Sequence, residues 1–82
     1  MSQHEKLLER LKGKPKDFAW SELERVLGAL GYEQEKGDGS RRRFFNPQTG
    51  AVISLHEPHP RKILKAYQMK DVLMHLREKG CL

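Results

Sequence analysis

The segment that decides the fold is KGDGSRRRFFNPQTGAVISLHEPHPRKILK, residues 36–65. Turn-forming residues at 37–39 and 46–50 separate stretches that have the composition of β-strands. The two prolines in residues 56–60 exclude a regular helix there and predict a stiff, exposed loop. We therefore predict three antiparallel strands, at residues 32–36, 41–46 and 51–55.

The middle strand of this set carries the sequence RRRFFN, residues 41–46. Because side chains alternate between the two faces of a strand, Arg41 and Arg43 share one face and Arg42 lies on the other. In the third strand the apolar residues of one face are expected to point to the core, so that His56 continues the register of the opposite face. One face of the sheet should therefore be strongly basic.

The sequence on either side of the strands predicts helices. Apolar residues recur at i, i+3, i+4 and i+7 from Leu23 and again from Met69, and Gly31 and Gly80 are placed to end the two helices. A shorter amphipathic pattern over residues 3–12 predicts one more helix. The order helix, helix, strand, strand, strand, helix indicates an α+β fold in which the helices pack on one face of a three-stranded antiparallel sheet.

Positive charge is concentrated in the second half of the chain. Residues 1–40 carry seven Lys and Arg against eight Asp and Glu, a net charge of −1, whereas residues 41–82 carry nine against three, a net charge of +6. This regional asymmetry indicates a polyanionic partner such as a nucleic acid. The alternative is a solvated basic face that only keeps the domain soluble.

Several classes of protein are excluded by composition. No apolar run approaches the roughly 20 residues that a membrane helix needs. The N-terminus lacks the continuous apolar segment of a secretory signal. The single cysteine, Cys81, can form neither an internal disulfide nor a multi-cysteine metal site. We expect one domain over residues 1–82, located in the cytoplasm and without membrane association.

A series of short motifs follows in a characteristic order. They are the helix end ALGY at residues 29–32, Gly39 and Ser40 before a basic strand, the NPQTG turn at residues 46–50, the strand at residues 52–55, His56, and the final helix. This series resembles the HicA family of type II toxin-antitoxin toxins, ribonucleases that cut mRNA without a metal on a fold like the double-stranded RNA-binding domain. The resemblance covers residues 20–80, which makes residues 1–15 an N-terminal helical extension.

The resemblance implies RNA as substrate, no cofactor, and a HicB-like antitoxin as partner. The family's active-site histidine follows the Gly-Ser pair, and Arg41 occupies that position in this chain. Arginine stays protonated at physiological pH, so it can bind phosphate but cannot readily accept a proton. His56, which matches a histidine position common in the family, and His59 are the candidates to replace the missing histidine.

Metal-free cleavage of RNA needs a base for the 2′-hydroxyl, a cation for the phosphoryl oxygens and an acid for the leaving 5′-oxygen. We interpret His56, His59 and Arg41 as catalytic candidates. The histidines fall short of a usual zinc ligand set, so no metal site is predicted. The candidate RNA-binding residues are Ser40, Arg41, Arg42, Arg43, Arg61, Lys62 and Lys65.

Two other functions remain open at this point. The domain could be a catalytically inactive RNA-binding module with the double-stranded RNA-binding fold. It could also be a protein-interaction domain whose basic face receives an acidic HicB-like partner. The two histidines would then serve only solvation or phosphate contact.

Overall fold

The computed structural model describes residues 3–80, so Cys81 lies outside it. Its elements are α1 (Gln3–Lys12), α2 (Trp20–Ala29), β1 (Glu33–Lys36), β2 (Arg41–Phe45), β3 (Val52–His56) and α3 (Ala66–Glu78). This order confirms the predicted α-α-β-β-β-α arrangement and the α+β class. No helix within the described residues is both long enough and apolar enough to span a membrane.

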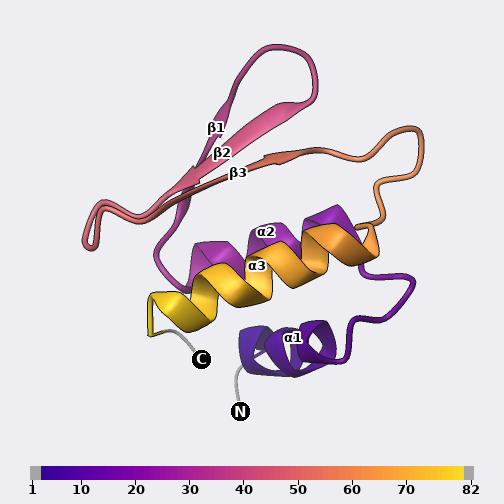
Figure 1. Cartoon of the computed structure of the whole chain (residues 1–82), viewed down its shortest axis with the longest axis horizontal. Helices are drawn as coiled ribbons and strands as arrows, with labels where there is room; N and C mark the ends of the chain where they lie inside the picture. The colour runs from indigo at the N-terminus through magenta and orange to yellow at the C-terminus, as the bar shows by residue number, and fades with distance from the viewer. Residues whose placement is uncertain (1–2, 81–82) are drawn as a thin grey trace.

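The three strands form one antiparallel sheet in the order β1-β2-β3. Figure 1 shows α2 and α3 under one face of this sheet, with α3 in front of α2, and α1 on the far side of the two helices. The helices therefore lie on one face, as predicted, with α1 as a third layer. The opposite face of the sheet, called the outer face below, is not covered by any helix in the described residues.

The core fills the space between the sheet and the helices. The ring of Trp20, at the start of α2, packs against the ring of Phe44 on β2 with centroids 5.7 Å apart. Leu55 of β3 and the apolar stripes of α2 and α3 are buried around them. Because Phe44 and Leu55 face this core, the alternation along β2 and β3 turns their polar neighbours to the outer face.

The N-terminal helix is held against the rest of the domain by a buried apolar side chain and by ion pairs. Leu11 of α1 is fully buried in the common core. The Arg10 guanidinium binds the carboxylates of Asp17 at 2.6 Å and Glu22 at 2.8 Å, and it lies 5.4 Å from the centroid of the Phe18 ring. The helix predicted as an extension thus belongs to the same folded unit.

The segment after β3 differs from the exposed loop that its prolines predicted. His56 is the last residue of β3 and not part of a loop. Glu57 and Pro58 are buried, and only the following residues, from His59 on, reach the surface. The reason is that the pairing with β2 continues one residue beyond His56, since Glu57 N–H donates a hydrogen bond of 2.8 Å to the carbonyl of Ser40. Alternation then turns the Glu57 side chain to the same side of the sheet as the buried Leu55.

Candidate functional site

The register of β2 and β3 brings Arg41 and His56 opposite each other. The next pair along the two strands is Ser40 and Glu57, and it is hydrogen-bonded, because Glu57 N–H donates to the carbonyl of Ser40. Hydrogen-bonded and non-hydrogen-bonded pairs alternate in an antiparallel sheet, so Arg41 and His56 form a non-hydrogen-bonded pair. In such a pair the two Cα atoms are only about 4.5 Å apart and the side chains point to the same face. The cation and the imidazole are therefore neighbours on the outer face.

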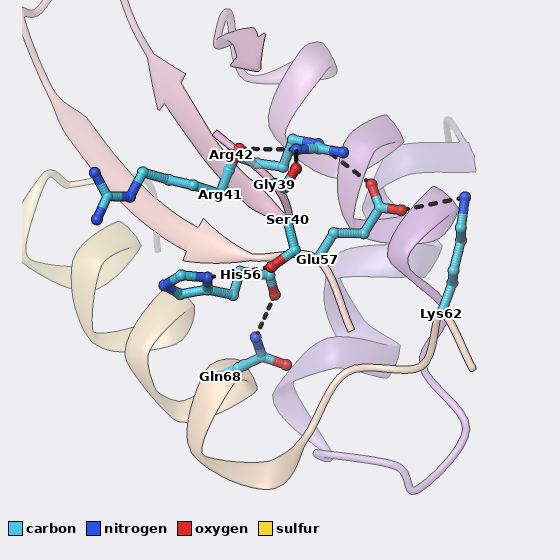
Figure 2. Close-up of polar contacts among 8 residues, drawn as sticks. All are labelled: Gly39, Ser40, Arg41, Arg42, His56, Glu57, Lys62 and Gln68. Atoms are coloured by element: carbon cyan, nitrogen blue, oxygen red, sulfur yellow. Dashed lines mark hydrogen bonds and ion pairs between the residues drawn. The ribbon is translucent and has the colours of Figure 1, made fainter. Parts of the chain in front are cut away.

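The surroundings of this pair are exposed and polar. Figure 2 shows the Arg41 and His56 side chains extending to the same side of the sheet. The hydroxyl of Ser40 lies 3.3 Å from Nδ1 of His56, which leaves Nε2 as the ring nitrogen available to a ligand. Within the described residues, no acidic side chain forms an ion pair with Arg41. Its charge is therefore available to an anionic ligand.

Arg43 shares the outer face but is partly occupied. Its Nη1 lies 3.6 Å from Oε2 of Glu35 on β1, and its guanidinium lies 5.7 Å from the centroid of the Phe45 ring. Both members of the ion pair are about half exposed, so the pair is weak and can yield to a phosphate. Arg41 and Arg43 together form a short basic strip along β2.

A buried glutamine fixes the end of β3 to α3. The Nε2 of Gln68 donates to the carbonyl of His56 at 2.8 Å, and its Oε1 accepts from Lys65 N–H at 3.0 Å. Gln68 is only 3% exposed. A capping box has Ser or Thr at the helix N-cap and Gln or Glu three residues later, and Gln68 matches the second of these two positions. The cap is Lys65, whose side chain has no hydrogen-bond acceptor, so the sequence lacks the other half of the capping box.

Arg42 lies on the opposite side of the sheet from Arg41. Its Nη1 donates to the carbonyls of Gly39 at 2.9 Å and Arg41 at 2.8 Å. Its Nε lies 3.4 Å from Oε1 of Glu57, whose Oε2 lies 3.1 Å from Nζ of Lys62. Figure 2 shows these three side chains pointing away from the outer face. Two of the predicted RNA-binding cations thus share one buried carboxylate.

The carboxylate of Glu57 is ionised in spite of its burial. Burial alone would raise its pKa, but the hydrogen bond from Lys62 and the positive charges of Lys62, Arg42 and His59 outweigh this effect and lower the pKa below its ordinary value. Because the pKa is lower in the folded state than in the unfolded state, the cluster stabilises the fold above the unfolded pKa. That stabilisation is lost as the pH falls through the folded pKa.

We expect Glu57→Gln to lower the free energy of unfolding by about 1–2 kcal/mol at pH 7, because Arg42 then stays buried without a counter-charge. Below pH 4.5 the free energy of unfolding should also decrease less in the variant than in the wild type, because the variant lacks the carboxylate of Glu57. Urea unfolding at pH 7 and at pH 3.5 measures both effects. An equal difference between variant and wild type at the two pH values would contradict the assignment.

The other candidate histidine lies elsewhere. His59 lines a surface hollow with Arg61 and Lys65 from its own segment and with Lys16 and Asp17 from the linker before α2. Neither Arg41 nor His56 contributes to the lining of this hollow. The structure therefore places the two candidate histidines at different sites, and only His56, which the resemblance to the family already favoured, lies beside Arg41.

Within the described residues, neither His75 nor any cluster of possible metal ligands offers a second site of this kind. Nε2 of His75 lies 2.8 Å from the hydroxyl of Tyr32, and burial lowers the pKa of this imidazole. Within residues 3–80 no group of three or more His, Cys, Asp or Glu side chains is arranged to hold a metal ion. The Arg41 and His56 pair is thus the best candidate for chemistry in the described part of the chain.

Comparison with known proteins gives one result. A family model described as the HicA toxin of bacterial toxin-antitoxin systems matches residues 20–78. The match runs from α2 to the end of α3 and includes all three strands, whereas α1 precedes it. Searches of curated proteins and of solved structures gave no match to the chain.

Proposed function

The chain belongs to the HicA toxin family of bacterial toxin-antitoxin systems, and from this premise we propose that it binds RNA on the outer face of its sheet and cleaves mRNA there. The observation that carries the proposal is the cross-strand pair of Arg41 and His56, with Ser40 in contact with the imidazole. The pair combines an unpaired cation and a proton-transfer group on an exposed surface. The proposed place of action is the cytoplasm.

The proposed reaction is an internal transfer of the phosphoryl group. The 2′-oxygen of a ribose attacks the adjacent phosphorus, a 2′-oxygen to phosphorus bond forms, and the bond from phosphorus to the 5′-oxygen breaks. The proton of the 2′-hydroxyl leaves during attack, and a proton is delivered to the departing 5′-oxygen. Arg41 would stabilise the charge on the non-bridging oxygens, because a guanidinium offers several donors to a phosphoryl group.

His56 is assigned the proton transfer. An imidazole can take up and release a proton near neutral pH, whereas the guanidinium of Arg41 cannot. The contact between Ser40 and Nδ1 would hold the ring so that Nε2 faces the substrate. Since His59 lies in a different hollow, His56 would carry out one of the two proton transfers and a water molecule the other.

The RNA-binding surface is proposed to centre on Arg41 and Arg43. Both are exposed on the outer face, where they would contact phosphates and position the strand without reading its sequence. Arg61 and Lys65, which are exposed beside the hollow of His59, would supply further phosphate contacts. We assign Arg42 and Lys62 a structural role instead, since both are paired with Glu57.

Charge reversal should reveal this surface. We expect the double variant Arg41→Glu and Arg43→Glu to weaken binding of a single-stranded RNA about tenfold or more at low salt. The logarithm of the binding constant falls linearly with the logarithm of the salt concentration. Each lost phosphate contact should make this decrease less steep by about 0.7–0.9. Fluorescence anisotropy with a labelled oligonucleotide measures both quantities.

The control for this variant is Arg25→Glu, which reverses an exposed charge on α2. Arg25 lies on the helical side of the molecule and should change the affinity only slightly. An affinity for RNA that stays the same in the double variant at low salt would rule out the proposed surface.

A second candidate function keeps the RNA binding and omits the cleavage. The observation that favours it is Arg41 itself, because the resemblance to the family implies a histidine at this position. Salt-sensitive binding of an RNA that stays intact would identify this function. In either case a HicB-like antitoxin is proposed to silence the protein by covering the outer face.

A further inference from the structure

A groove runs between the end of α1 and the exposed side of α3. It has a volume of about 400 Å³ and is lined by Lys12, Lys14, Lys70, Leu73, Met74 and Arg77. Four of these residues are cations and none is acidic. The groove is not part of the RNA face, because α2 and α3 separate α1 from the sheet (Figure 1).

The charge of the groove is largely uncompensated. Nζ of Lys12 lies 3.0 Å from a carboxylate oxygen of Glu9, one turn earlier on α1. In the part of the chain that the structure describes, Lys14, Lys70 and Arg77 form no ion pair. Three neighbouring cations without acidic partners produce a positive potential that favours an anionic ligand.

One exposed apolar side chain, Met74, lines the groove, and a second, Tyr67, lies on the same face of α3. Met74 is 49% exposed and Tyr67, two helical turns earlier on α3, is 59% exposed. Together with Lys70 and Arg77 they occupy positions i, i+3, i+7 and i+10, which lie along one face of a helix. Large exposed apolar residues rimmed by charge mark surfaces that bind other proteins.

We propose that this groove binds an acidic amphipathic helix of the antitoxin. The cations would pair with its carboxylates, and Met74 and Tyr67 would receive its apolar residues, as in other grooves that accept one face of a helix. The stripe from Tyr67 to Arg77 is about 15 Å long, which matches some three turns of a helix. RNA is disfavoured as the occupant because phosphates would use the cations and leave Met74 uncovered.

The location of the groove gives this contact a distinct role. Half of the cations come from residues 12–14, which lie before the matched family region of residues 20–78. The N-terminal helix thus adds a binding surface to the family domain. An antitoxin bound in the groove would remain attached while the outer face of the sheet is open. The groove would then bind the antitoxin, and the outer face would be the surface that it covers to inhibit the protein. The proposal rests on the family membership and not on RNA cleavage.

Two charge-reversal variants of equal size test the groove in the full chain. Lys14→Glu with Lys70→Glu should weaken the complex with the co-expressed antitoxin about tenfold or more, whereas Lys6→Glu with Arg25→Glu, two exposed residues that do not line the groove, should change it less than about threefold. Affinity for a single-stranded RNA should be the same in both variants. Equal weakening of the antitoxin complex in the two variants would overturn the proposal.

The chemistry of the occupant is tested with a synthetic 16-residue helical peptide that has leucines along one face and glutamates on the other. We expect the peptide to bind the wild type, and to bind Met74→Ala several-fold more weakly, while a scrambled peptide of the same composition binds poorly. The proposal fails if the scrambled peptide binds as well, if the helical peptide does not bind, or if the groove variant loses RNA affinity instead.

Discussion

Replacing His56 with alanine is expected to lower the rate of RNA cleavage by about 10²–10⁴-fold, the usual contribution of a positioned acid or base. The reason is that His56 is the imidazole that faces Arg41 across the strand pair, and none of the other residues paired between β2 and β3 has a side chain that exchanges protons near neutral pH. The affinity for RNA should change little, because an exposed imidazole adds few contacts compared with the arginines. Single-turnover cleavage of a labelled RNA separates the two effects.

His59→Ala is the matched control for this variant. It removes the same side chain from the same segment, but from the hollow beside Arg61 and Lys65. Cleavage by His59→Ala should stay close to that of the wild type. If His59→Ala lost cleavage while His56→Ala kept it, the catalytic assignment would have to move to the loop.

The second large effect concerns stability and not activity. We expect Leu11→Ala to lower the free energy of unfolding by about 3 kcal/mol, because Leu11 is fully buried where α1 meets the core and its loss leaves a cavity. The affinity for RNA should be unchanged in the fraction that is folded. Chemical denaturation followed by circular dichroism measures the change.

Lys6→Ala is the control in the same helix. Lys6 is exposed, so its replacement should alter the stability by less than about 0.5 kcal/mol. A similarly small effect of Leu11→Ala would mean that α1 is not docked in solution. The basic groove between α1 and α3 could then not exist as the structure describes it.

The main features of the sheet could be predicted from the sequence because they follow from local patterns. The alternation in residues 41–46 assigned Arg41 and Arg42 to opposite faces, and the structure confirms this. The turn at residues 46–50 fixes the pairing of β2 with β3. For this reason the proximity of His56 to the arginine strand could be anticipated without a structure.

The contacts below the sheet could not be predicted in this way. The cluster of Glu57 with Arg42 and Lys62 depends on where the chain turns after β3, and the prolines indicated only that it is extended. The pattern thus gave an exposed loop where the structure buries Glu57 and Pro58. The groove depends on the position of α1 against α3, which is a tertiary contact with no signal in either helix.

The chemistry at Arg41 and His56 is tested most directly by the ends of the RNA fragments. Purified protein should cleave a single-stranded RNA in the presence of EDTA, and the fragments should carry 5′-hydroxyl and 2′,3′-cyclic phosphate ends, as attack by the 2′-oxygen requires. Arg41→Glu and His56→Ala should each suppress these products. Intact RNA at protein concentrations that saturate binding, or fragments with 5′-phosphate and 3′-hydroxyl ends, would contradict the proposed site.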